Sequence, residues 1–203
     1  MTLSKISYFL FFAFSTLLFS KESKPMKLWP DTAPGEVSGE IGNEDYRKPK
    51  QGAKDVLRIA NVSVPTITFY EANPTKSNGT VIIVCPGGGY NILAYAHEGT
   101  QVCEWLNELG ITGVLLKYRV PRRKNRRPHD APLQDLQRAI GLVRQNASNL
   151  KIDPQKVGVL GFSAGGNLAM MAVTSFEERA YTQVDSADQY SCRPDFGILI
   201  YPA

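Results

Sequence analysis

The sequence predicts an α/β fold with a mainly parallel sheet, and three observations support this. Apolar runs typical of strands alternate with stretches of helical periodicity between residues 64 and 201. The runs at 81–85 and 157–160 are continuously apolar, as in strands buried on both faces. Right-handed crossovers then place helices on both faces of the sheet, which gives a three-layer α/β/α sandwich. The length of 203 residues favours a single domain.

The first half of this domain contains two strands and a helix. Residues 64–70 alternate apolar and polar side chains, which indicates an antiparallel or edge strand. The turn cluster 73–79 separates it from the buried strand 81–85. Apolar residues recur with helical spacing over 97–109, which predicts a helix packed on the sheet. The predicted apolar stripe of that helix comprises Val102, Trp105, Leu106 and Leu109.

The second half repeats the alternation. A strand is predicted over 113–118, and a helix follows over 132–147. The buried strand 157–160 leads into a helix of small residues over 164–174, and a last strand covers 196–201.

The N-terminus has the layout of an export signal. Lys5 is the only charge in the first 20 residues, and Ile6–Phe19 is an apolar run interrupted only by small hydroxyls. The run is shorter than the ~20 residues of a membrane-spanning helix. We therefore expect residues 1–20 to be a signal peptide and the protein to be secreted or periplasmic. If the segment stays uncleaved, residues 6–19 anchor the chain to a membrane.

The mature chain divides into two parts. Residues 21–55 are polar and rich in Pro, Gly and Lys, and they are interpreted as a lead-in that wraps the surface or is flexible. Residues 56–203 form the α/β domain. Three cysteines are too few for a disulfide framework and could form one bridge at most, so buried thiols are the expected interpretation.

The net charge of +4 comes from one stretch. Residues 117–127 contain seven basic side chains and no acidic one, whereas the rest of the chain has 16 basic and 19 acidic residues. A nucleic-acid surface needs a basic face with aromatic or groove-fitting partners, so a solvated loop is the simpler interpretation. Binding of anionic polymers is the minor alternative. Nucleic acid is therefore not an expected partner.

The strongest chemical signal is the G-x-S-x-G pattern at residues 161–165. A buried strand precedes it and a helix follows it, which is the context of a nucleophile elbow. Gly161 and Gly165 flank Ser163 because strand and helix nearly touch at such a turn and leave no room for side chains. The turn raises the Ser163 hydroxyl above the carboxyl edge of the sheet, where α/β enzymes bind ligands.

A glycine-rich loop supports this interpretation. Residues 85–90, Cys-Pro-Gly-Gly-Gly-Tyr, follow the first buried strand. Successive glycines allow backbone N–H groups to turn toward a ligand, as in the oxyanion loop of esterases. The alternatives are an ordinary glycine turn for the first pattern and a phosphate-binding loop for the second. The dinucleotide and P-loop fingerprints are absent from the sequence.

Several further motifs make the chain similar to a known family. They are L-W-P-x-x-A-P-G (28–35), N-V-S-V-P-T (61–66), V-C-P-G-G-G-Y (84–90), H-E-G (97–99), L-K-Y-R-V-P (116–121), A-P-L-Q-D (131–135), G-F-S-A-G-G (161–166) and R-P-D-F-x-I-L-I-Y-P (193–202). From about residue 27 onward the chain resembles the α/β-hydrolase superfamily. Within it, the chain is similar to exported bacterial esterases of the acetylxylan-esterase-like and lipase/esterase group.

The resemblance implies a serine carboxylesterase that acts on acetyl esters, including those of xylan or other carbohydrates. It implies that Ser163 is the nucleophile and that the N–H groups of Gly88, Gly89 and Ala164 form the oxyanion hole. Asn167 stands where family members often carry His, and we give it no catalytic role. No cofactor is implied, and no metal either, because no His/Cys/Asp cluster has ligand spacing.

The acid and the histidine of a triad are not found in their expected places. In this superfamily they follow the serine in chain order, whereas His97 and His129 both precede Ser163. The acidic residues after Ser163 all precede the last strand: Glu177, Glu178, Asp185, Asp188 and Asp195. We therefore expect the domain to be incomplete at its C-terminus. The alternative is an inactive, truncated hydrolase-like protein that binds carbohydrate.

Overall fold

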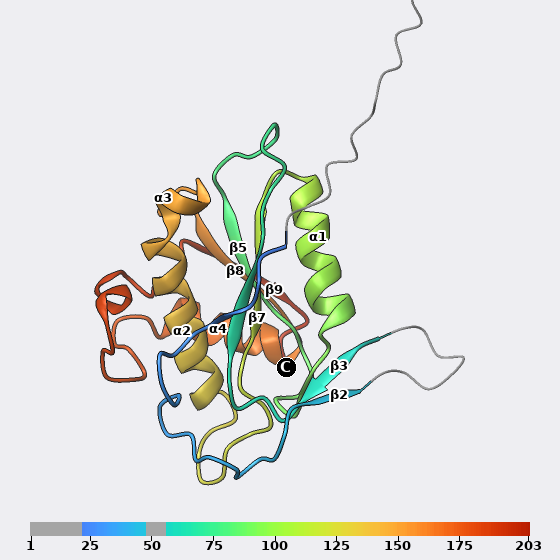
Figure 1. The fold of residues 1–203 in the computed structure, drawn as a ribbon, viewed down its shortest axis with the longest axis vertical. Coiled ribbons are helices and arrows are strands. Elements are labelled where there is room, and N and C mark those ends of the chain that lie inside the picture. Colours follow the sequence, from blue (N-terminus) through green and yellow to red (C-terminus); the bar gives the residue numbers. More distant parts are fainter. Residues whose placement is uncertain (1–21, 48–55) are drawn as a thin grey trace, which may run out of the picture.

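Figure 1 shows a computed structural model that describes residues 22–47 and 56–203, in which one large sheet forms the centre. Its strands, in spatial order, are β1 (Met26–Lys27), β4 (Thr66–Tyr70), β7 (Thr112–Lys117), β5 (Val81–Cys85), β8 (Val157–Phe162) and β9 (Phe196–Ile200). β4 runs antiparallel to both β1 and β7, whereas β7, β5, β8 and β9 are parallel to one another. The predicted α/β class with a mainly parallel sheet is confirmed.

Helices cover both faces of this sheet (Figure 1). They are α1 (Gln101–Glu108), α2 (Asp130–Gln145) and α4 (Ala164–Thr174). Ile83 packs in one cluster with Leu136 of α2 and Leu168 of α4, whereas Ile82 packs with Leu106 of α1. Because successive strand residues point to opposite faces, α2 and α4 lie on one side and α1 lies on the other. The three predicted layers are present.

A second, smaller sheet was not predicted. It consists of β2 (Asp45–Arg47), β3 (Arg58–Ala60) and β6 (Ile92–Leu93), paired antiparallel in that order. Strands of two or three residues are too short to show a period of two, so no sequence pattern marks them. β6 follows the glycine-rich loop directly, so its pairing with β3 holds the C-terminal end of that loop.

The helix predicted over 97–109 begins with a π-helical turn, η1 (Ala96–Thr100), before α1. The prediction of its buried stripe was wrong in part, because Trp105 and Leu109 are 52% and 51% exposed whereas Leu106 is buried. In the π turn the Thr100 N–H donates to the Tyr95 carbonyl oxygen, five residues back. The buried residues of α1 are instead Cys103, Leu106 and Asn107, and the Asn107 side-chain amide donates to the Tyr70 carbonyl oxygen of β4 at 2.7 Å, so a polar residue occupies part of the face toward the sheet.

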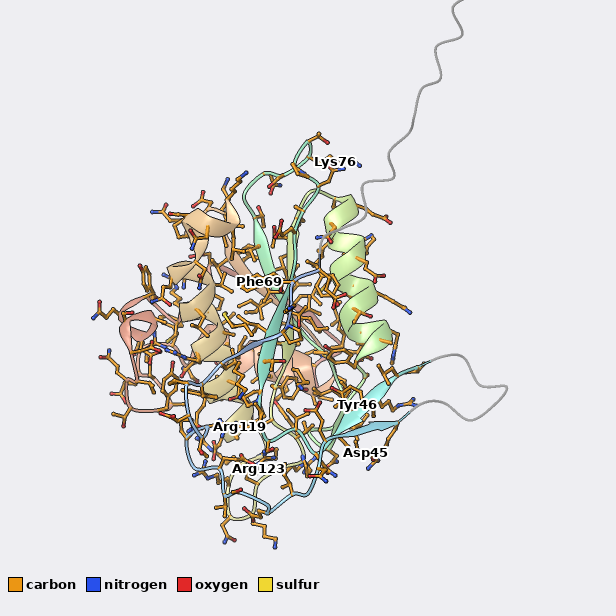
Figure 2. All side chains as sticks on the ribbon, in the orientation of Figure 1. Asp45, Tyr46, Phe69, Lys76, Arg119 and Arg123 are labelled. Atoms are coloured by element: carbon orange, nitrogen blue, oxygen red, sulfur yellow. The ribbon has the colours of Figure 1, made fainter. Side chains whose placement is uncertain are left out.

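The lead-in of residues 22–47 packs against the domain. Leu28 and Trp29 are buried, and the Trp29 Nε1–H donates to the Asp135 carboxylate at 2.9 Å. Asp135 also accepts from the Arg119 guanidinium at 3.0 Å and is itself fully buried. Figure 2 shows Arg119 beside the blue lead-in, and its guanidinium donates to the Pro34 carbonyl oxygen at 2.9 Å.

The cysteines are free and buried, as predicted: Cys85, Cys103 and Cys192. The expected signal peptide and the possible anchor at 6–19 lie outside the described residues. Within residues 22–47 and 56–203, no helix is long and apolar enough to cross a membrane.

Candidate active site

The G-x-S-x-G pattern forms the expected strand–turn–helix elbow. β8 ends at Phe162, Ser163 takes φ 50° and ψ −119°, and α4 begins at Ala164. A positive φ is rare for a residue with a side chain, and such strain is concentrated at functional sites. The turn is fixed from both sides, because the Ser163 N–H donates to the Ile200 carbonyl oxygen at 3.0 Å and its carbonyl accepts from the Asn167 N–H at 2.9 Å.

The two elbow glycines are required by space. A Cβ atom at Gly161 would lie 2.0 Å from the Gly165 carbonyl oxygen. A Cβ atom at Gly165 would lie 2.1 Å from the Cys85 carbonyl oxygen and 2.6 Å from that of Pro86. The atoms in the way belong to the backbone and cannot rotate aside. Gly165 is therefore also the point where the elbow helix meets the start of the glycine-rich loop.

The sheet register brings the glycine-rich loop to the same level as the elbow. β5 and β8 are parallel neighbours, and Cys85 at the end of β5 pairs with Gly161. The loop therefore leaves the sheet at the edge where Ser163 stands, and a Cβ atom at Gly87 would lie 3.1 Å from the Ser163 Cβ. Gly88 has φ +136°, and a Cβ atom there would lie 2.1 Å from the Ile92 carbonyl oxygen.

Several backbone N–H groups near the serine have no hydrogen-bond acceptor among the residues described. The N–H groups of Gly88, Gly89 and Ala164 donate no hydrogen bond to any described residue. Within the same part of the chain, the Ser163 Oγ has no hydrogen-bond partner, and the residue is partly exposed, so the hydroxyl is reachable. A reachable hydroxyl close to unpaired N–H donors is the arrangement that binds the oxyanion of a tetrahedral intermediate.

Two tyrosines hold the glycine-rich loop in place. Tyr90 has φ +59°, is buried, and donates its O–H to the Asn167 Oδ1 at 2.9 Å. The Tyr118 O–H donates to the Pro86 carbonyl oxygen at 2.5 Å. Burial raises the pKa of both phenols well above the ordinary value, so they remain donors at neutral pH. Asn167 thus links the elbow helix to the loop.

Glu98 is a site residue to which the sequence analysis gave no role. Its carboxylate accepts the Gly87 N–H at 2.8 Å and the Tyr201 O–H at 2.7 Å. The hydrogen bond to Glu98 raises the pKa of Tyr201 to about 12. Glu98 therefore joins the glycine-rich loop to the residues that follow β9. The only sequence signal for it was its place in the H-E-G motif.

Within the described residues, neither histidine has a hydrogen bond to Ser163. His97 lies in η1, with its Nε2 3.6 Å from the Glu98 carboxylate. His129 precedes α2, and its Nε2 is buried without a hydrogen-bond partner in the described structure, 3.9 Å from Asp130. Burial lowers the pKa of His129, which favours the neutral ring.

Three of the five acidic residues after the serine are paired with arginines. Asp185 and Asp188 accept from Arg138, and Asp195 accepts from Arg144 at 2.9 Å. The described residues contain no group of three or more His, Cys, Asp or Glu side chains arranged to hold a metal ion.

Comparisons with known proteins agree with this geometry. The family model described as BD-FAE matches residues 67–198. The chain is 35% identical over 129 residues to an acetylxylan esterase of Xylanibacter ruminicola, an alignment that covers 64% of this chain and 24% of that protein. It is 31% identical over 139 residues to endo-1,4-beta-xylanase B of Butyrivibrio fibrisolvens, covering 68% of this chain and 21% of that protein.

Two solved structures are also similar. An acetyl ester-xyloside bifunctional hydrolase from Caldicellulosiruptor lactoaceticus matches with a TM-score of 0.65 and 36% identity, over 92% of this chain and 59% of that one. An esterase from Thermogutta terrifontis matches with a TM-score of 0.58 and 25% identity, over 80% of this chain and 54% of that one. The chain spans less than two thirds of the length of each of these four relatives. Because the family model covers well over half of the sequence, the chain belongs to the BD-FAE family, within the α/β-hydrolase esterases.

Proposed function

We propose that this chain carries the nucleophile half of a serine carboxylesterase. The observation that supports it best is the strained, reachable Ser163 hydroxyl beside the unpaired N–H groups of Gly88, Gly89 and Ala164. In this reaction the Ser163 Oγ attacks the ester carbonyl carbon and gives up its proton to a base. The carbonyl oxygen becomes an oxyanion held by the N–H groups, and the base returns the proton to the alcohol as the ester C–O bond breaks. Water then hydrolyses the acyl-enzyme, which releases the acid and restores the Ser163 hydroxyl.

The described residues give Ser163 no histidine partner, because neither His97 nor His129 has a hydrogen bond to it. We propose that the acid and the base of the triad come from residues that this chain does not contain. The similar chains are longer than the part that matches here, which is compatible with this division.

Acetyl esters, including those on xylan, are the substrate class that we propose. The names of two relatives support it: an acetylxylan esterase and an acetyl ester-xyloside bifunctional hydrolase. We also propose that the protein is exported, because Ile6–Phe19 is an apolar run behind a single lysine.

The test uses p-nitrophenyl acetate with and without added imidazole as an external base. Without imidazole we expect background hydrolysis only. With imidazole, hydrolysis by the wild-type chain should exceed that by Ser163→Ala, because imidazole can accept the proton that the Ser163 Oγ gives up during its attack. Ser148→Ala, which removes an exposed hydroxyl in the short helix α3 (Ala147–Leu150), should behave like wild type.

Two results would contradict the proposal. Equal rates for wild type and Ser163→Ala at every imidazole concentration would remove Ser163 as the nucleophile and favour a carbohydrate-binding role, which titration with xylo-oligosaccharides would then measure. Fast turnover that depends on Ser163 without imidazole would show that the chain contains its own base.

A further inference from the structure

The basic stretch 117–127 lies against the glycine-rich loop, and its charges fall into two groups. Four of its basic side chains form ion pairs with carboxylates at 2.7–3.0 Å. These pairs are Lys117–Glu44, Arg119–Asp135, Arg123–Glu36 and Arg127–Asp130. They hold the stretch to the lead-in and to α2, so their charges are neutralised within the fold.

The remaining three basic side chains, Arg122, Lys124 and Arg126, have no carboxylate partner in the part of the chain that the structure describes. The Arg122 Nε and Nη2 both donate to the Gly89 carbonyl oxygen, at 3.3 and 2.9 Å. This carbonyl belongs to the loop that carries the proposed oxyanion donors. Arg122 therefore places an unneutralised cation at the rim of the candidate active site.

A cavity of about 230 Å³ adjoins this cation. It is lined by Glu40, Ile41, Pro121, Arg122, Arg123 and Lys124. Since Arg123 is paired with Glu36, the free charges on its wall are the cations Arg122 and Lys124, opposed by the single carboxylate of Glu40. The wall thus has an excess of positive charge.

We infer that this rim is a subsite for a carboxylate on the substrate, so that the enzyme favours esters borne by acidic sugars. The inference rests on the proposed function for its meaning, although binding can be measured without hydrolysis. A guanidinium fixed by its Nε and Nη2 still presents Nη1–H groups, and planar N–H donors match the geometry of a carboxylate. Its attachment to the Gly89 carbonyl limits the side-chain entropy lost on binding.

The experiment compares D-glucuronate with D-glucose, which differ by the carboxylate at C6, as NMR titrants of the labelled chain. Wild type should bind glucuronate about fivefold more tightly than glucose, the upper range for an exposed ion pair. The shifts should centre on Gly89. Arg122→Gln should reduce the preference to within about twofold, whereas Arg122→Lys should retain most of it. Lys151→Gln, which removes an exposed cation at the end of α3, should leave the preference unchanged.

A second variant guards against misfolding of the first. Lys124→Gln combined with Arg126→Gln removes charge without touching the contact to Gly89, and it should also lower the preference. Equal affinity for the two sugars in wild type, or a preference that persists in Arg122→Gln, would overturn the inference. Ser163→Ala should keep the preference for glucuronate, so failure of the hydrolysis assay and failure of this subsite remain distinguishable.

Discussion

Replacing Gly161 by Ala should lower the free energy of unfolding by more than a glycine replacement that costs backbone strain alone. The new Cβ would lie 2.0 Å from the Gly165 carbonyl oxygen and 2.7 Å from the Gly166 nitrogen. Overpacking of a core costs about 1–3 kcal/mol. Because both obstructing atoms are backbone atoms of the elbow helix, we expect a loss at the top of this range, about 3 kcal/mol.

Gly39→Ala is the matched control. Gly39 has φ +79° but nothing within 4 Å of an added Cβ, so the control measures the conformational cost alone, about 1 kcal/mol. In urea unfolding followed by circular dichroism, with a slope of about 2 kcal/mol/M, the midpoint should fall by about 1.5 M for Gly161→Ala and about 0.5 M for Gly39→Ala. Equal midpoint shifts would refute the view that close contact between β8 and α4 fixes the elbow.

Three further outcomes follow from the structure. Glu98→Gln removes a charged acceptor of two hydrogen bonds and should lower the free energy of unfolding by about 1–3 kcal/mol in urea unfolding; no change would show that these contacts contribute nothing. The hydrogen bond from Arg138 lowers the pKa of Asp185 below its usual 3.8, so its stabilisation is complete above that value and is lost as the pH falls through the folded-state pKa. The difference in urea midpoint between wild type and Asp185→Asn should therefore be constant above about pH 5 and shrink as the pH falls below about 4, and a difference that stays constant there would contradict this. Burial raises the pKa of the Cys85 and Cys103 thiols, which pack against the central sheet. A thiol reagent at about pH 8 should therefore label these two cysteines only after denaturation.

Much of the fold was predictable because its signals are local. The strand at 81–85 and the helix at 164–174 have the predicted bounds, since a continuous apolar run and an elbow motif mark their ends. The strands of the small sheet and the phase of α1 were not predictable. The strands are too short for periodicity, and the buried face of α1 includes Asn107, a polar residue that donates to the Tyr70 carbonyl oxygen and that an apolar pattern does not select.

Part of the candidate site was likewise predictable from the sequence and part was not. The elbow and loop glycines follow from two motifs, because sterics fix glycine at those places. The supports around them join residues far apart in the chain: Tyr90 and Asn167 are 77 positions apart, and Glu98 and Tyr201 are 103 apart. Such pairs are set by the tertiary fold, and a single sequence contains no periodic trace of them.

The burial of Trp29 against Asp135 has a consequence for proteolysis. Residues 38–40 lie in an exposed turn after this contact, so a protease is expected to cut there. The N-terminal piece would nevertheless remain attached, because the Trp29 indole stays hydrogen-bonded to a fully buried carboxylate. A nicked molecule should therefore elute as one species in native buffer and separate into two chains only in denaturant.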